Sequence, residues 1–140
     1  MRIGTLSDIL REDLDLSDLY RVSKEEEMTP EKKASNLLYD LMLSPGYKGY
    51  KYLREALIML CDDSTEYGSF TKYIYPVIAG KFKTTPQNVE KNIRFAIQKI
   101  YKMNSPEELE EKLGKNPIVC SKPSNVKFIT FCAEKLRLER

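Results

Sequence analysis

The sequence predicts an all-α fold, and two kinds of pattern support this prediction. Apolar residues recur with the 3.6-residue period of a helix, and no stretch shows the alternation that is typical of a half-buried strand. Thr-Pro or Ser-Pro pairs precede three of the periodic stretches, and a capping residue followed by proline favours the first turn of a helix. Because 140 residues suffice for one domain with its own core, we expect about six helices packed like a bundle, plus a short N-terminal appendage.

The distribution of charge indicates where this appendage ends. Residues 1–31 carry four basic and nine acidic side chains, whereas the rest of the chain carries 19 basic and 12 acidic ones. Residues 1–22 mix acidic residues with leucine, which favours one or two short helices, and the three glutamates at positions 25–27 are typical of a solvated link. We therefore assign residues 1–28 to an acidic N-terminal helical appendage and residues 29–140 to a basic main domain.

Periodicity and stop signals place the helices of the main domain in order. The first begins at Thr29-Pro30 and ends at Ser44-Pro45-Gly46, and the last runs from about Ser124 to Leu138, after an extended connection over residues 116–123. Between them we expect a helix from Tyr50 to Cys61, two helices within residues 75–101, and one between Ser105 and Gly114. The residues expected on the apolar sides are Leu37, Leu38, Leu41 and Met42 in the first helix, Tyr50, Leu53, Leu57 and Leu60 in the second, and Phe128, Ile129, Phe131, Cys132 and Leu136 in the last.

Residues 75–101 have the pattern of a helix-turn-helix, the central motif of the chain. Thr85 is placed to cap the second helix and Pro86 to occupy its first turn. In the first helix, small Ala79 and Gly80 would let the second helix approach closely. The second helix has an apolar side that we expect to be buried, formed by Val89, Ile93, Ala96, Ile97 and Ile100. Its opposite side is a polar stripe of Gln87, Glu90, Lys91, Arg94 and Gln98.

The charge of this motif favours binding to nucleic acid. Residues 71–103 contain seven lysine or arginine residues and a single acidic residue, Glu90. A basic face on a helix-turn-helix is typical of a DNA-reading module. Amphipathic helix pairs that only pack against each other are a common alternative. A second mixture of rings and lysines, Tyr47, Tyr50 and Tyr52 with Lys48 and Lys51, either stacks on bases or packs in the core, and its helical spacing favours the core.

Several functional classes lack support in the sequence. Cys61, Cys120 and Cys132 are far apart and the chain has no histidine, so neither a metal site nor a catalytic dyad is indicated, and we expect neither a cofactor nor enzyme activity. Adjacent Asp62 and Asp63 are typical of a polar turn. Because no stretch approaches the length of a membrane span, and no signal peptide is present, we expect a cytoplasmic protein without a membrane partner.

Three segments carry a family resemblance. In order they read GYKGYKYLREALIML, FTKYIYPVIAGKFKTTPQNVEKNIRFAI and KPSNVKFITFCAEKLRLE. They resemble the C-terminal DNA-binding effector domain of the master response regulator of sporulation in endospore-forming bacteria, over approximately residues 34–139. The resemblance implies an all-helical transcription regulator that binds short boxes in double-stranded DNA, often as a homodimer on tandem sites. It also implies RNA polymerase as a partner, near residues 107–112.

In this family the reading helix corresponds to residues 86–101. Arginine can donate to guanine and a carboxylate can accept from cytosine, so Arg94 and Glu90 together suit a C/G-containing box. The full set of expected base-reading residues is Gln87, Asn88, Glu90, Lys91, Arg94 and Phe95. The candidates for phosphate contacts are Lys72, Lys81, Lys99, Lys122 and Lys127.

The chain also departs from the family pattern. Asn88 and Lys91 stand where the family usually has arginine, and Phe95 replaces a histidine, so the preferred box is expected to differ. Lys83 stands where many helix-turn-helix units have glycine, which predicts a turn of a less common type. The residues before the match are too few for a receiver domain, so the acidic appendage either forms a new dimer contact or lies against the basic face. The alternative function is an interaction protein without a receiver that modulates a full-length regulator and barely binds DNA.

Overall fold

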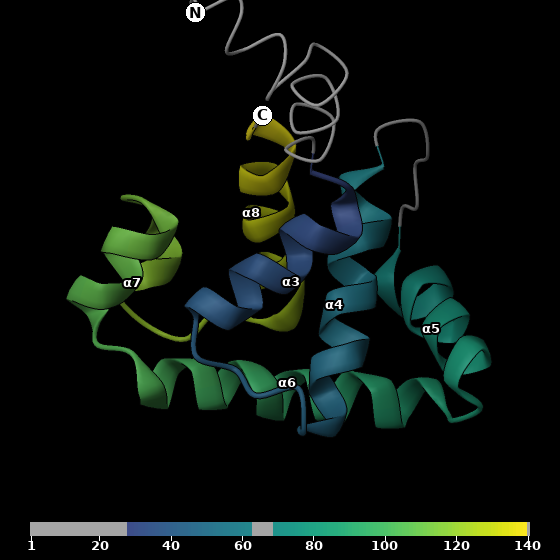
Figure 1. Ribbon diagram of the computed structural model, residues 1–140. Coiled ribbons are helices and arrows are strands. Elements are labelled where there is room, and N and C mark those ends of the chain that lie inside the picture. The colour runs from purple at the N-terminus through teal and green to yellow at the C-terminus, as the bar shows by residue number, and fades with distance from the viewer. Residues whose placement is uncertain (1–27, 63–68, 140) are drawn as a thin grey trace, which may run out of the picture. The chain divides into compact units, whose positions relative to one another are not determined.

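Four helices begin at or beside the residues that the sequence indicated, at Pro30, Pro86, Pro106 and Asn125, whereas the helix predicted from Tyr50 begins at Lys48. The computed structural model describes residues 28–62 and 69–139 (Figure 1). Over these residues the chain forms no strand, and its elements are α3 (Pro30–Asp40), α4 (Lys48–Cys61), a π-helical turn η1 (Phe70–Ile74), α5 (Tyr75–Phe82), α6 (Pro86–Met103), α7 (Pro106–Leu113), a 3₁₀ turn η2 (Pro117–Val119) and α8 (Asn125–Leu138). The all-α prediction is therefore confirmed for the described part of the chain. The predictions for the appendage and its glutamate run concern residues that lie outside that part.

Three of the helix starts have side-chain caps. The hydroxyl groups of Thr85 and Ser124 accept hydrogen bonds from the backbone N–H groups three residues further on, at Asn88 and Lys127. Ser105 forms a complete capping box with Glu108, in which each side chain accepts from the backbone of the other. Because these bonds satisfy N–H groups that have no partner within the helix, the starts of α6, α7 and α8 are fixed locally by sequence.

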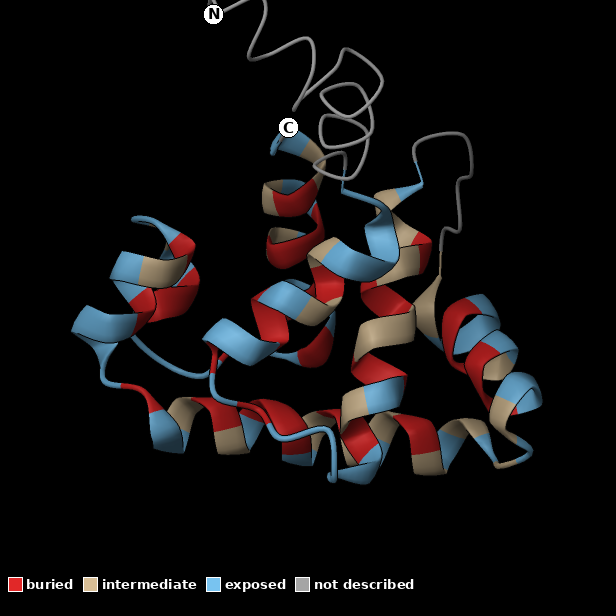
Figure 2. Ribbon diagram, in the orientation of Figure 1, coloured by how far each residue is buried: buried red, intermediate tan, exposed pale blue. Residues whose placement is uncertain are grey.

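Helix α4 is the centre of the packing. It contacts α3, α6 and α8, and α5 packs against α6. In Figure 1, α6 runs across the bottom of the view and the other helices lie above it. Buried residues gather on the sides of the helices that face one another (Figure 2). This arrangement leaves the lower side of α6 without a covering element among the described residues.

The end of α3 differs from the prediction. The helix ends at Asp40, and Met42 adopts a positive φ of 69° and is 53% exposed, so its assignment to the apolar side was wrong. The N–H of Leu43 donates to the carbonyl of Leu38 and the N–H of Met42 donates to that of Tyr39, the two bonds of a Schellman motif. Leu43, the next residue, is 3% exposed and belongs to the core instead.

Three smaller predictions are also corrected. The buried side of α4 is rotated, since Tyr50 and Leu60 are half-buried whereas Tyr52, Ala56 and Met59 are buried. In α8 the predicted core set holds, except that Phe131 is only half-buried. The connection over residues 116–123 is not fully extended, because the Asn116 side chain accepts from the N–H of Ile118 and starts the turn η2. The described helices include none that is both long and apolar enough to cross a bilayer.

Candidate nucleic-acid interface

Helix α6 separates apolar from polar side chains as its sequence predicted. Its buried residues are Val89, Ile93, Ala96, Ile97 and Ile100, which is the predicted set. The helix continues two residues beyond the predicted end at Tyr101 and closes at Asn104, whose side-chain amide donates to the carbonyls of Leu41 and Ile100. This buried amide ties the end of α6 to the segment after α3. The apolar side therefore holds α6 firmly while its other side remains accessible.

The accessible side carries the residues predicted to read DNA, and we call them the reading face. Gln87, Lys91 and Phe95 are exposed, while Asn88, Glu90 and Arg94 are half-buried. The side chains of Glu90 and Arg94 each keep 40% of their surface accessible. All six side chains can thus be reached from outside the described domain. Their spacing along α6 places all six on one side of this single helix.

Glu90 and Arg94 form an ion pair one helical turn apart. Arg94 Nη1 donates to both carboxylate oxygens of Glu90, at 2.7 and 2.6 Å. The guanidinium carbon also lies 5.6 Å from the centre of the Phe95 ring, within the range of a cation–π contact. Arg94 retains its other guanidinium nitrogens as donors, and Glu90 retains acceptor capacity. The pair holds two side chains of opposite chemistry side by side before any ligand binds.

Asn88 is less free than its position on the reading face suggests. Its side-chain nitrogen donates to Thr84 Oγ1 at 2.9 Å, and its side-chain oxygen accepts from the amide of Asn92 at 3.0 Å. Asn92 also donates to the backbone carbonyl of Asn88. These bonds run along the edge of α6 from the preceding turn. Asn88 therefore keeps only part of its hydrogen-bonding capacity for an external partner.

The turn between α5 and α6 corrects the prediction from Lys83. This residue has φ 56° and ψ 52°, the left-handed conformation that glycine usually adopts at the end of a helix. The N–H of Thr84 donates to the carbonyl of Ala79. The residue type is unusual for the position, but the backbone conformation is the one that glycine would provide.

The close approach to α6 occurs at Gly49 rather than at Gly80. Gly80 is exposed, and a Cβ built on it would have no neighbour within 4 Å. A Cβ on Gly49 would lie 2.1 Å from the backbone oxygen of Asn92 and 2.9 Å from Cβ of Ala96. The first turn of α4 thus rests directly on the backbone of α6. Gly80 therefore does not mediate the predicted close approach of α5 to α6, whereas Ala79, the other small residue of that prediction, is buried.

Two helix starts flank the reading face. The start of α4 contacts α6 near Asn92, and the start of α8 contacts it at Glu90, whose backbone carbonyl accepts from the Asn125 side chain at 3.0 Å. Asn92 and Glu90 lie about 200° apart around the helix. Asn125 also donates to Tyr75 Oη, at 3.3 Å, and burial raises the pKa of that phenol.

The predicted phosphate-contact lysines differ in their surroundings. Lys72 and Lys127 are exposed in the first turns of η1 and α8, and Lys122 is exposed beside the start of α8. Lys81 forms an ion pair with Glu55, at 2.9 Å, which offsets its charge. Arg54 donates to Ser35 Oγ at 2.7 Å. Arg54 and Glu55, which are adjacent in α4, thus each contact a neighbouring helix.

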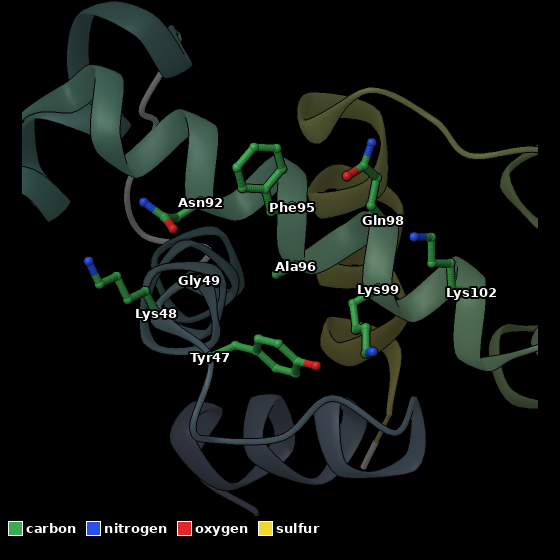
Figure 3. Close-up of a pocket in the computed structure, with 9 residues that line it drawn as sticks. All are labelled: Tyr47, Lys48, Gly49, Asn92, Phe95, Ala96, Gln98, Lys99 and Lys102. Atoms are coloured by element: carbon green, nitrogen blue, oxygen red, sulfur yellow. The ribbon is translucent and has the colours of Figure 1, made fainter.

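Of the two alternatives for the tyrosine-lysine stretch, core packing is confirmed for Tyr52, and stacking on bases stays a prediction. Tyr52 is buried and packs edge-to-face on Phe82, with ring centres 5.5 Å apart. Tyr47 is 41% exposed, and with Lys48 it lines a pocket beside α6 (Figure 3). Sequence reasoning missed this pocket. The signal was present in the glycine between the two lysines of the stretch, but its partner on α6 could not be identified without the structure.

The family comparison agrees with this geometry. Among the described residues no group of three potential ligands could hold a metal ion. Residues 34–136 match the family described as sporulation initiation factor Spo0A, C terminal. This is a family of DNA-binding effector domains that regulate transcription, and not a family of enzymes. The chain, with its helix-turn-helix and its accessible basic helix, belongs to this family of Spo0A C-terminal effector domains.

Proposed function

We propose that the protein is a sequence-specific transcription regulator whose helix α6 enters the major groove and reads a short C/G-containing box. The observation that carries this proposal is the Glu90–Arg94 pair on the accessible side of α6. A major groove admits one α-helix, and its base edges present donors and acceptors that side chains of this kind can distinguish. The apolar side of α6 is fully used for packing, so the reading face is the side that remains for DNA.

In this proposal each residue of the pair has a definite role. Arg94 donates to O6 and N7 of guanine, and Glu90 accepts from the N4 amino group of cytosine. Because the ion pair already restrains both side chains, less conformational entropy is lost on binding. Phe95 is 50% exposed and is placed to contact a thymine methyl group. Gln87 and Lys91 add further donors on the same face, and Asn88 contributes its remaining capacity.

The flanking lysines would position the domain on the duplex. Lys72, Lys122 and Lys127 are exposed around the starts of η1 and α8, where we place one phosphate backbone of the groove. Lys99 lies on the opposite flank, toward α4. Lys81 would have to leave Glu55 to contribute. Contacts of this kind fix the orientation of a protein on DNA without specifying sequence.

Selection of bound duplexes from a random pool tests the proposal. We expect the full chain to recover a short motif that contains C/G pairs, and the spacing of recovered copies would report any tandem binding. Affinity for the recovered box should fall about tenfold or more between 50 and 200 mM salt, because several phosphates are neutralised. Recovery of no motif, with only weak binding to every duplex, would contradict the proposal and would support the alternative of an interaction protein.

A further inference from the structure

Beside the reading face lies a basic pocket of about 370 Å³. The start of α4 forms one wall with Tyr47 and Lys48, and α6 forms the other with Phe95, Lys99 and Lys102 (Figure 3). Figure 3 shows Lys48 and Lys102 at opposite ends of the pocket, with Tyr47 and Phe95 on its two edges. The pocket therefore combines three ammonium groups with two aromatic rings.

Among residues 28–62 and 69–139, no carboxylate forms an ion pair with the lysines of this pocket. Lys48 and Lys102 are exposed and Lys99 is half-buried. None of the three forms an ion pair with a described residue, whereas Lys81, Arg94 and Lys135 all do. Lys99 Nζ lies 5.7 Å from the centre of the Tyr47 ring, a contact that restrains the lysine without neutralising it. Three positive charges around one concave surface, without an ion-pair partner in the described part of the chain, favour an anionic ligand.

The two walls of the pocket are in direct backbone contact. Gly49 lets the first turn of α4 touch the backbone oxygen of Asn92, so the two walls cannot move apart without losing this contact. Tyr47 at the start of α4 provides no side-chain hydrogen bond to the first N–H groups of the helix. These N–H groups add partial positive charge near Lys48.

The location of the pocket points to the source of the anion. Phe95 belongs both to the reading face and to the edge of the pocket, and Lys102 lies two turns further along the same side of α6. A helix in a major groove has a phosphate backbone along each flank. We infer that this pocket binds a backbone phosphate of the DNA strand on the α4 flank, with Lys48 and Lys102 as contacts in addition to Lys99. This inference rests on the proposed function.

Charge removal at the two ends of the pocket tests the inference. The variants are Lys48→Gln and Lys102→Gln, with Lys115→Gln, at an exposed lysine after α7, as the matched control. At about 0.1 M salt each pocket variant should weaken binding of the selected box by about fivefold to tenfold and lower the salt slope by about 1. The preference for one box over another should stay unchanged, since phosphate contacts carry no sequence information. Thermal unfolding of the variants should match that of the wild type.

Modified duplexes locate the contact. Boxes with a single neutral methylphosphonate at successive positions should weaken wild-type binding at one or two phosphates on the α4 flank. The Lys48→Gln, Lys102→Gln double variant should bind a box with a methylphosphonate at those phosphates as tightly as it binds the unmodified box. If it loses affinity there as the wild type does, the inference is overturned.

Two further outcomes separate the inference from the proposed function. Wild-type binding with sequence preference, combined with unchanged affinity in both pocket variants, overturns this inference and leaves the proposed function standing. Absence of duplex binding by the wild type overturns both.

Inorganic pyrophosphate serves as the free-anion probe. If the pocket variants lose pyrophosphate binding but keep full DNA affinity, the pocket serves a free anion and the assignment to the DNA backbone is wrong.

Discussion

Two residues adopt backbone conformations that their side chains disfavour. Met42 and Lys83 have positive φ angles, of 69° and 56°. The left-handed region costs an L-residue roughly 1–2 kcal/mol, because Cβ crowds the following carbonyl, and glycine avoids this cost. Both positions end a helix, and the hydrogen bonds of Leu43 and Thr84 to earlier carbonyls hold the chain in that conformation. These local hydrogen bonds therefore help to maintain both turns against the preference of the side chains.

Met42→Gly should stabilise the protein. The substitution relieves the positive φ and removes a side chain that is already 53% exposed, so we expect a gain of up to about 1 kcal/mol in the free energy of unfolding. The matched control is Met103→Gly, at a methionine that is 43% exposed in the last turn of α6. That change should destabilise, by up to about 1 kcal/mol, because glycine disfavours a helix. Urea unfolding measures both, and a loss of stability in Met42→Gly would contradict the expectation.

At the scale of elements, the contact between α4 and α6 places the basic pocket and the reading face next to each other. It depends on one glycine, since a methyl group at Gly49 would lie 2.1 Å from the Asn92 carbonyl oxygen. Real Cβ atoms do not approach an oxygen so closely. A side chain at this position would force the first turn of α4 away from α6.

A pair of identical substitutions tests this contact. Gly49→Ala should destabilise the protein by about 1–3 kcal/mol or more, because a packed contact must open. Gly80→Ala in α5 is the matched control, and it should stabilise by up to about 1 kcal/mol, since its methyl group meets no neighbour and alanine favours helix. The free energies of unfolding of both variants give the answer. Equal effects in the two variants would show that the close approach at Gly49 does not matter.

The sequence predicted some element boundaries well and others poorly, for physical reasons. The starts of α6, α7 and α8 followed from Thr85, Ser105 and Ser124, because a cap is a local hydrogen bond between residues three apart. The end of α3 did not follow, because a methionine at the left-handed position gives no sequence signal. The role of Gly49 depends on an α6 residue more than 40 positions away, so only the structure could assign it.

At the scale of the whole molecule, the half-buried phenol of Tyr101 and the buried thiol of Cys132 couple stability to alkaline pH. Tyr101 Oη donates to the carbonyl of Ile118 at 2.5 Å, and burial, with a smaller effect of Cys132, raises the pKa of this phenol above its ordinary value of 10.0. Burial likewise raises the pKa of Cys132, to about 12. Each group holds its proton more tightly in the folded protein. Each group therefore contributes its full share of stability at a pH below the pKa that it has in the unfolded chain. This contribution is lost as the pH rises through the pKa that the group has in the folded protein.

Tyr101→Phe should make the alkaline loss of stability shallower. At pH 7 the variant should lose about 1 kcal/mol, the net value of a hydrogen bond. Above pH 10 the difference in free energy of unfolding between wild type and variant should narrow, because only the wild type has this phenol to titrate. Cys132 and Tyr75 still titrate in both proteins, so the variant keeps part of the alkaline loss. The matched control is Tyr39→Phe, at a tyrosine that is 81% exposed, which should leave the pH profile unchanged. Urea unfolding from pH 7 to 11 is the measurement, and a constant gap would refute the coupling.

The reading face followed from the sequence more completely than the rest of the interface. A single amphipathic helix reveals its buried and exposed sides by periodicity alone, and the buried set of α6 was predicted residue by residue. The partners on that face, such as the bonds of Asn88 to Thr84 and Asn92, require rotamers that periodicity does not provide. The pocket at Tyr47 and Lys48 requires the packing of two helices, so it appeared only in the structure.

The central claim is that Arg94 reads a base whereas Lys72 only positions the domain. The most direct test measures the ratio of affinities for the selected box and for a box with its C/G pair changed, in the wild type, Arg94→Ala and Lys72→Ala. The ratio is the proper readout, because removing Arg94 also frees the Glu90 carboxylate and lowers affinity for every duplex. We predict that Arg94→Ala loses about 1–3 kcal/mol of discrimination, while Lys72→Ala weakens both boxes equally and keeps the wild-type ratio. Equal loss of the ratio in both variants, or loss in neither, would contradict the claim.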